Sequence, residues 1–537
     1  MNILPIFINS KIAKIQTLKI FLILAIVAGA ISLVAGVGLM ANGSKKAWIG
    51  IVIGAILLVI GITFLITKVK GKKEELTKLS NKLKKEIEKY TEEAYFQMAP
   101  LNKLFDSNVA ARLFNKTCPL IEMDRIFDVT KYEMMKEKYG LWDNTDPSFS
   151  TLDLQSGSIL GNPFVVFKDL NVAMRDHVYT GTHTITYSRG YGKERHIVTE
   201  TLRATYVAPE PIYSKETYLV YGNEGAQKLS FSREKSNINQ MSEEEIKKYV
   251  RKHEKDLDKL ANEKMKKGGT FTPIGNPEFE LFFGGLDRDN EIEFRLLFTA
   301  LGQKSMMDLL KSKDGYGDDF SFKKVKGLNV VQSEHSQGTT LFVSADDYKG
   351  FDFEVVKRHF IEFNDNYFKA LFFDFAPLLS IPLYSQYKTH DYIYKNTIKS
   401  NFVPFLHEVV SNRYNPSSLA DPKTKTDVIL KTNFESKTGK TDNVKVIAHS
   451  FEKVNRIAQV SVRGGDGFMH TVDVPWIEYI PLVKENLIQV SDVEVSDEAK
   501  FNSLGKKDVV YANGLISNVG GKLSVDINKI KDFMKKV

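Results

Sequence analysis

Two uncharged apolar runs near the amino terminus constrain the fold of this chain more than any other feature. Residues 20–41 (IFLILAIVAGAISLVAGVGLMA) and 47–67 (AWIGIVIGAILLVIGITFLIT) contain no charged side chain. Because an α-helix rises about 1.5 Å per residue, each run is long enough to cross a hydrocarbon core of about 30 Å. The alternatives are a cleavable signal peptide, which would have a shorter apolar region, and a buried hairpin of a globular domain. We predict that residues 1–67 form a transmembrane helical hairpin.

The lysine residues around these runs predict an orientation. Three precede the first run, two lie in the turn between the runs, and eight follow within about 20 residues of the second run. Because lysine is enriched on the cytoplasmic side, we expect a two-span protein of the plasma membrane with both termini in the cytoplasm. The residues expected to contact anionic lipid headgroups are Lys68, Lys70, Lys72 and Lys73.

Small residues recur at intervals of four within both runs. They are Ala28, Ser32 and Gly36 in the first run, and Gly50 and Gly54 in the second. Such spacing lets helix backbones approach closely, so these residues are candidates for transmembrane packing. They would pack the hairpin on itself or form a homo-oligomer, and the first alternative is favoured.

Net charge is distributed unevenly along the chain. The total is +8, but the first 90 residues carry +10, so the remaining 447 residues carry −2. A nucleic-acid-binding domain usually has a basic surface on its folded part, which is not expected here. The predicted partners are therefore a lipid bilayer with anionic headgroups and an unidentified protein, and not a nucleic acid. A single cysteine, Cys118, agrees weakly with a cytoplasmic domain.

The rest of the chain predicts an α+β fold with antiparallel sheets. A charged helix over 68–98 has a narrow apolar stripe, typical of a short coiled coil or of the first helix of a domain. An α+β domain over 99–385 follows, with an inserted helix at 242–267 that begins in a Ser242–Glu245 capping box. Its expected strands are 164–170, 182–187, 196–207, 279–283, 292–297, 320–324, 328–332 and 340–344.

A second α+β domain is expected over 386–537. One helix over 392–413 is interrupted by Pro404, and four strands follow at 427–432, 444–451, 458–462 and 469–474. The glycine-rich segment 463–467 between the last two strands lacks the Lys-Ser/Thr ending of a phosphate-binding loop. We interpret it as a hairpin turn.

Two motifs carry a resemblance to a known family. They are residues 156–167 (SGSILGNPFVVF) and 276–299 (NPEFELFFGGLDRDNEIEFRLLFT). Together with the two apolar runs and the charged helix, they resemble a widespread bacterial family of twin-span membrane proteins known as a domain of unknown function, over about residues 70–385. The inserted helix at 242–267 and the region after 385 depart from the family pattern. The resemblance implies a membrane-anchored cytoplasmic protein and no particular reaction.

No catalytic, cofactor-binding or metal-ligating residues are predicted. His177, His183 and His196 flank one hairpin, but no cysteine or carboxylate stands beside them at a metal spacing. Two acidic segments, 287–293 and 314–319, are better explained as solvated turns than as a carboxylate pair or a calcium loop. The aromatic-rich helix at 351–375 has more than one apolar face, so it is either core or an interface, and core is favoured.

Two functions remain open at this level. The first is an interaction module for a protein or lipid partner, with a role in assembly. The second is a membrane-bound enzyme or a transporter accessory subunit whose pocket is assembled from distant loops. A pocket with convergent histidines or carboxylates would favour the second, and an apolar patch near 351–384 would favour the first.

Overall fold

The computed structural model describes residues 71–492, except for 107, 191, 193–194, 315, 342–344, 396, 398–401 and 440. It also describes 509–512, 515–519 and short helical stretches between 17 and 63. The chain forms two compact units. The first contains residues 1–104 and 349–357, and the second contains 105–348 and 358–537.

The first unit is dominated by one long helix, α3 (Gly71–Asn102). Residues 71–98 of this helix correspond to the charged helix predicted over 68–98, and residues 68–70 lie outside the described part of the chain. Near its end, the Asn102 side-chain amide donates to the Gly350 carbonyl at 3.0 Å, and Tyr95 packs edge-on against Phe351 at 5.5 Å between ring centroids. These contacts fix residues 349–357 against the end of α3.

The predicted transmembrane hairpin is wrong. Within the residues that the structure describes, no helix has both the length and the apolar composition that crossing a bilayer requires. The membrane-anchored fold class and the two-span plasma-membrane location with cytoplasmic termini are corrected with it.

The residues proposed for membrane packing and headgroup contact are only partly described. Ala28 is exposed and Ser32 is half-buried in the described helical stretches. Lys72 and Lys73 begin α3, where only the backbone is described. Five of the predicted residues lie outside the described part of the chain: Gly36, Gly50, Gly54, Lys68 and Lys70.

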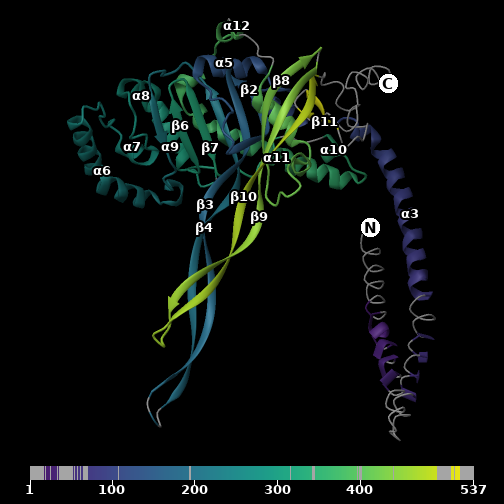
Figure 1. Ribbon diagram of the computed structural model, residues 1–537. Helices are drawn as coiled ribbons and strands as arrows, with labels where there is room; N and C mark the ends of the chain where they lie inside the picture. Colours follow the sequence, from purple (N-terminus) through teal and green to yellow (C-terminus); the bar gives the residue numbers. More distant parts are fainter. Residues whose placement is uncertain are drawn as a thin grey trace. The chain divides into compact units, whose positions relative to one another are not determined.

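The second unit is built on a seven-stranded antiparallel sheet with the order β1-β2-β3-β4-β7-β6-β5 (Figure 1). Residues 164–167 of β3 are fully buried on both faces, which explains why this segment is a continuous apolar run rather than an alternating one. The strands are β1 (Ile121–Met123), β2 (Phe149–Ile159), β3 (Asn162–Arg189), β4 (His196–Gly222), β5 (Ser230–Arg233), β6 (Phe320–Val325) and β7 (Leu328–Ser333).

A second sheet of five antiparallel strands has the order β11-β12-β10-β9-β8. The turn predicted at 463–467 is confirmed, since the Gly464 N–H donates to the Phe468 carbonyl at 2.8 Å. The strands predicted at 444–451 and 458–462 are one strand. The strands are β8 (Ile429–Thr438), β9 (Thr441–Arg463), β10 (Met469–Asp492), β11 (Val509–Ala512) and β12 (Leu515–Val519).

Helices cover one face of the seven-stranded sheet, and the five-stranded sheet with further helices covers the other. On the first face Phe164 and Val166 of β3 pack with the helices α4, α7, α8, α9 and α11. On the second face Val165 and Phe167 pack with α5, α13 and the inner residues of β8, β9 and β10. The helices are α4 (Val109–Thr117), α5 (Val129–Tyr139), η3 (Ile238–Gln240), α6 (Glu243–Lys266), α7 (Pro277–Phe283), α8 (Glu291–Leu297), α9 (Ala300–Leu310), α10 (Ala345–Tyr348), α11 (Phe353–Leu379), η4 (Pro382–Ser385), α12 (His390–Ile393), α13 (Pro404–Asn412) and α14 (Pro416–Leu419).

Several predicted elements have a different form. The strands expected at 279–283 and 292–297 are the helices α7 and α8, because Asn276 and Asn290 cap their first turns by accepting hydrogen bonds from backbone N–H groups. The helix expected over 392–413 is divided into α12 and α13, since Pro404 occupies the first position of α13. The predicted capping box of α6 is confirmed.

A buried ion pair joins the two sheets. Glu408 of α13 accepts a hydrogen bond from the Thr151 N–H of β2 at 2.9 Å, and its other oxygen lies 3.2 Å from the Lys431 Nζ of β8. Burial raises the pKa of Glu408 to about 7. The same lysine donates to the Phe149 carbonyl at 2.7 Å. One charged pair therefore holds three elements in a fixed arrangement.

Candidate functional site

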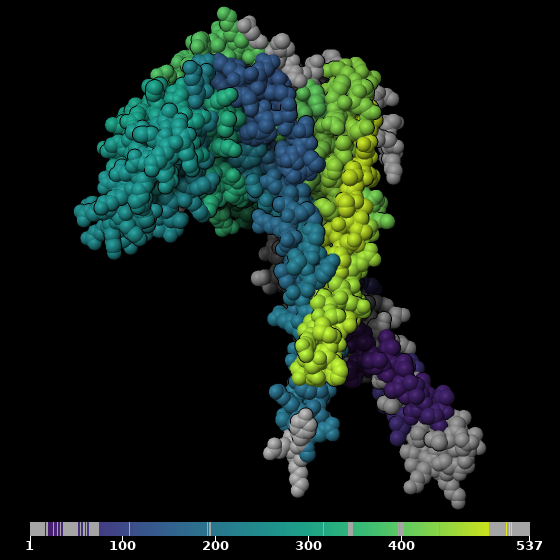
Figure 2. All heavy atoms as spheres, turned by 60° about the vertical axis from the view of Figure 1, so that its left-hand side comes forward, coloured from purple at the N-terminus to yellow at the C-terminus, as the bar shows by residue number. Residues whose placement is uncertain are grey.

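Two hairpins continue beyond the sheets and form a two-layer stalk, defined here as residues 172–213 and 450–482. The first is the outer part of β3 and β4, and the second is the outer part of β9 and β10. Beyond Asn171 and Ser214 the first hairpin has no third strand among the described residues. Figures 1 and 2 show the two hairpins side by side, with the first extending further.

The layers meet at a glycine. A Cβ atom on Gly181 of β3 would lie 2.2 Å from the Asp473 carbonyl oxygen of β10, so only glycine permits this approach. On either side of the crossing a small core forms between the layers. Its buried residues are Ile185, Leu202, Ala204, Val472 and Val474.

The turn of the second hairpin is fixed against the first. The Gly465 N–H donates to the Glu200 carboxylate at 2.8 Å, and His470 Nε2 lies 2.8 Å from Asp466 Oδ2. The ring of His183 stacks on the ring of His470 at 6.5 Å between centroids. Polar contacts thus close the stalk where its apolar core ends.

The three histidines singled out in the sequence do not form a site. In the register of β3 and β4, His177 is opposite Ala208, His183 is opposite Leu202, and His196 is opposite Arg189. His177 instead contacts Glu210 at 3.1 Å. In the part of the chain that the structure describes, no three His, Cys, Asp or Glu side chains gather closely enough to hold a metal ion.

The outer face of the first hairpin carries rows of exposed threonines. Thr184 is opposite Thr201, with 3.3 Å between their hydroxyls, and Thr186 is opposite Thr199 at 3.5 Å. The remaining threonines of this face are Thr180, Thr182 and Thr205. Between Thr180 and Thr186 of β3 and between Thr199 and Thr205 of β4, this face is polar, and Arg203 is its one charged residue.

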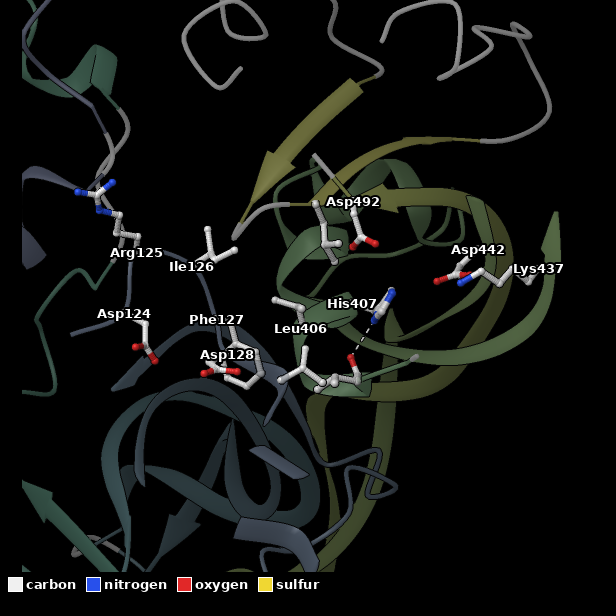
Figure 3. Close-up of a pocket in the computed structure, with 13 residues that line it drawn as sticks. Asp124, Arg125, Ile126, Phe127, Asp128, Leu406, His407, Lys437, Asp442 and Asp492 are labelled. Atoms are coloured by element: carbon white, nitrogen blue, oxygen red, sulfur yellow. Dashed lines mark hydrogen bonds and ion pairs between the residues drawn. The ribbon is translucent and has the colours of Figure 1, made fainter. Parts of the chain in front are cut away.

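A pocket of about 630 Å³ lies between distant segments of the second unit (Figure 3). Asp124 and Asp128 lie on one side of it, and Asp492, His407 and Asp442 lie on the other. Asp124 and Asp128 belong to the segment before α5, and His407 belongs to α13. This pocket is assembled from segments distant in the chain, as the alternative enzyme prediction expects of its site.

The histidine of this pocket is neutral and fixed. His407 Nδ1 donates to the Val403 carbonyl at 2.8 Å, because a carbonyl can only accept. Burial lowers the pKa of His407. Its Nε2 therefore carries a lone pair.

The carboxylates of the pocket already have structural partners. Asp124 pairs with Lys131 at 2.5 Å, Asp128 accepts the Thr130 N–H at 2.8 Å, and Asp442 lies 3.4 Å from Lys437 Nζ. A general base needs a geometry in which its proton acceptor can reach a substrate. Three of the four carboxylates are engaged instead in holding the chain.

A second histidine lies in a buried acidic cluster. His335 Nδ1 is 2.6 Å from Asp319 Oδ2, and Nε2 is 3.1 Å from the Ala370 carbonyl. Because both partners are acceptors, the doubly protonated ring satisfies both. Burial alone would lower the pKa of His335, but Asp319 and the nearby Asp374 raise it. Burial raises the pKa of Asp374 to about 7.

The other acidic residues noted in the sequence have structural contacts. Asp287 accepts hydrogen bonds from the Ser232 N–H and hydroxyl, Asp289 accepts from the Ser230 N–H at 2.7 Å, and Glu293 accepts from the Lys228 N–H at 2.6 Å. They hold β5 and do not form a carboxylate pair. Asp318, in the segment compared with a calcium loop, forms a buried ion pair with Arg233.

The aromatic-rich helix expected at 351–375 is α11, and its later part is core. Tyr367, Leu371 and Phe375 are buried against the helix-covered face of the sheet. Cys118 is buried, and desolvation raises the pKa of its thiol. Sequence reasoning missed the groups Glu408, Lys431, His335 and Asp374, whose partners are far away in the chain. It also missed His407, although its hydrogen-bond partner Val403 is only four residues away.

Comparisons with protein-family models, with curated proteins and with solved structures found no match for this chain. The resemblance to a twin-span bacterial family therefore stays a prediction. The function has to be inferred from the geometry of the stalk and the pocket.

Proposed function

We propose that this protein is an interaction module that binds a protein partner through its stalk. The observation that carries the proposal is the stalk itself, in which two hairpins leave the sheets and bury only a small core between them. An isolated two-stranded hairpin is marginally stable in water. A long projecting pair of hairpins therefore adds little to the stability of the body, and its main property is accessible surface.

The surface of the stalk has the composition of a recognition surface. Apolar side chains are exposed along it, among them Val178 at 57% and Ile457 at 67% exposure. They lie between threonines and a few charged residues rather than in one large apolar patch. Backbone groups along the outer strand edges add hydrogen-bonding capacity, which peptide-binding sheets use for affinity.

The competing prediction of an enzyme has less support. The pocket beside His407 contains carboxylates, but Asp124, Asp128 and Asp442 have partners that hold the chain. The nitrogens of His335 are both engaged, so this ring has no free atom for proton transfer. A catalytic site requires a nucleophile or base aimed at a substrate position.

Site-specific photocrosslinking of the full-length chain in its native cells tests the proposal. A benzophenone amino acid replaces Thr182 or Thr205, which are exposed on the outer face of the stalk. The matched control replaces Lys255, which is exposed on α6. We expect discrete adducts from both stalk positions and none from α6. Absence of stalk adducts, or equal adducts from all three positions, would contradict the proposal.

A further inference from the structure

The two hairpins of the stalk have four outer edges, and hydrogen bonds identify which residues point outward along them. Along an antiparallel strand, alternate residues direct their backbone groups toward the partner or away from it. The Val172 N–H of β3 donates to the Ser148 carbonyl at 2.7 Å, away from β4. The ladder with β4 continues from there without a bulge. The backbone N–H and C=O groups of even-numbered residues of β3 therefore point away from β4, toward the free edge, and these residues are called outward-facing below.

The same reasoning applies to the other three edges. The register pairs outward-facing Asp176 with Pro209, so odd-numbered residues of β4 face outward. In β9, the Phe451 N–H donates outward to Thr426 Oγ1 at 3.0 Å, and Phe451 is paired with Pro481 of β10. Odd-numbered residues thus face outward in both strands of the second hairpin. Both assignments agree with the prolines, which have no N–H to donate to the ladder.

Three of the edges are interrupted by residues that prevent further strand pairing. Natural sheets protect free edges with proline, with charged side chains or with a covering loop. The outward positions of β4 include Pro209, Pro211 and Arg203. Those of β10 and β9 include Asp473, Pro475, Pro481, Lys453 and Arg463.

The edge of β3 has no such protection between Val178 and Ser188. Its six consecutive outward positions contain neither proline nor a charged residue, which is the longest run of this kind in the stalk. No strand or loop among the described residues pairs with it beyond Val172. The outward residues are Val178, Thr180, Thr182, Thr184, Thr186 and Ser188.

We propose that this edge of β3 pairs antiparallel with the same edge of a second copy of the chain. The inference rests on the proposed function and names the partner of the stalk. A two-fold axis near His183 places Val178 opposite Ser188, Thr180 opposite Thr186, and Thr182 opposite Thr184. Such an isologous contact uses one surface twice, as two-fold dimers do.

Self-complementarity favours a second copy over an unrelated strand. The edge matches itself in length, and the pairing sets no charged residue against a like charge between Val178 and Ser188. It also places threonine opposite threonine, the arrangement that β3 already makes with β4 through Thr184–Thr201 and Thr186–Thr199. The result is one continuous four-stranded sheet with the order β4-β3-β3-β4. Because the contact is smaller than a standard interface, its association is concentration-dependent.

Two proline variants that occupy opposite positions in the ladder test this pairing. Thr184→Pro removes an outward N–H from β3, and Thr201→Pro makes the same change on β4, directly opposite. Neither removes a bond between β3 and β4, and both lose the same hydroxyl contact. Sedimentation velocity of the full-length chain over a concentration series measures association. Circular dichroism checks that each variant keeps its sheet content.

We expect the natural chain and Thr201→Pro to dimerise alike, and Thr184→Pro to weaken dimerisation about tenfold or more. Thr184→Lys and Thr201→Lys repeat the comparison with a charge at each edge, in case a proline variant does not fold. The pairing is overturned if the natural chain stays monomeric at the highest soluble concentration. It is also overturned if the Thr184 and Thr201 variants weaken dimerisation equally. If stalk photocrosslinks then reach only other proteins, the proposed function stands without self-pairing.

Discussion

Replacing Gly181 by alanine tests how the two layers of the stalk are held together. The added Cβ would lie 2.2 Å from the Asp473 carbonyl oxygen and 2.9 Å from the Val474 Cα atom. These are backbone atoms, so no side-chain rotation relieves the overlap, and the layers have to separate by about 1 Å to restore an ordinary contact distance. Overpacking of this kind costs about 1–3 kcal/mol.

The cost falls on the stalk, because each hairpin depends on the other layer for stability. A two-stranded hairpin is marginal by itself, and the contact between layers buries only a small group of side chains, including Leu202 and Val472. We therefore expect local opening of the stalk to become more frequent by about 5- to 150-fold, the equivalent of 1–3 kcal/mol. The body, whose cores lie elsewhere, keeps its stability.

Hydrogen exchange followed by mass spectrometry measures this difference in the full-length chain. Peptides over 454–478 report on the stalk, and peptides over 219–222 and 328–333 report on the central sheet. Gly275→Ala is the control, since a Cβ at Gly275 meets no atom within 4 Å. Stalk amides of Gly181→Ala that exchange as slowly as those of the natural chain would refute the close-approach argument.

Three further changes have defined outcomes. Burial raises the pKa of Asp374 from 3.8 to about 7, so the folded state holds its proton more tightly than the unfolded state. The free energy of unfolding therefore falls as pH rises from 3.8 to about 7. The pKa of His335 is also raised, and it changes stability in the same direction. In Asp374→Asn, the free energy of unfolding measured with urea should depend less on pH across that range. An unchanged dependence on pH would count against this role of Asp374. Glu408→Ala should lower the free energy of unfolding by about 3–5 kcal/mol by leaving the Lys431 charge unpaired. Adding Lys431→Met should restore much of the lost stability. Failure to restore it would contradict the conclusion that the unpaired Lys431 charge causes the loss. Ser242→Ala removes the capping box of α6 and should cost about 1 kcal/mol by thermal unfolding.

The sequence predicted the antiparallel α+β class because local signals carry it. Glycine-containing turns at 161–162 and 463–467 have few alternative conformations, and the structure contains both hairpins. The strands expected at 279–283 (FELFF) and 292–297 (IEFRLL) were wrong because short apolar segments of this length fit a strand and a helix alike. Asn276 and Asn290 decided the outcome by capping the first helical turns.

The full extent of the stalk could not be predicted from periodicity. Residues 173–178 of β3 are exposed on both faces, so the apolar alternation that marks a half-buried strand is absent there. Buried charges were also invisible, because Glu408 and Thr151 are separated by 257 residues in the chain. Only the folded backbone brings such groups together.

The continuity of β3 has a mechanical consequence. The strand runs from Asn162 in the centre of the seven-stranded sheet to Arg189 near the tip of the first hairpin, on the order of 90 Å of unbroken backbone. A pull on the tip would reach the middle of the body along covalent bonds. There β3 is hydrogen-bonded to β2, and β4 is hydrogen-bonded to β7. These rows of hydrogen bonds would share the load, so the hairpin would transmit tension before the body yielded.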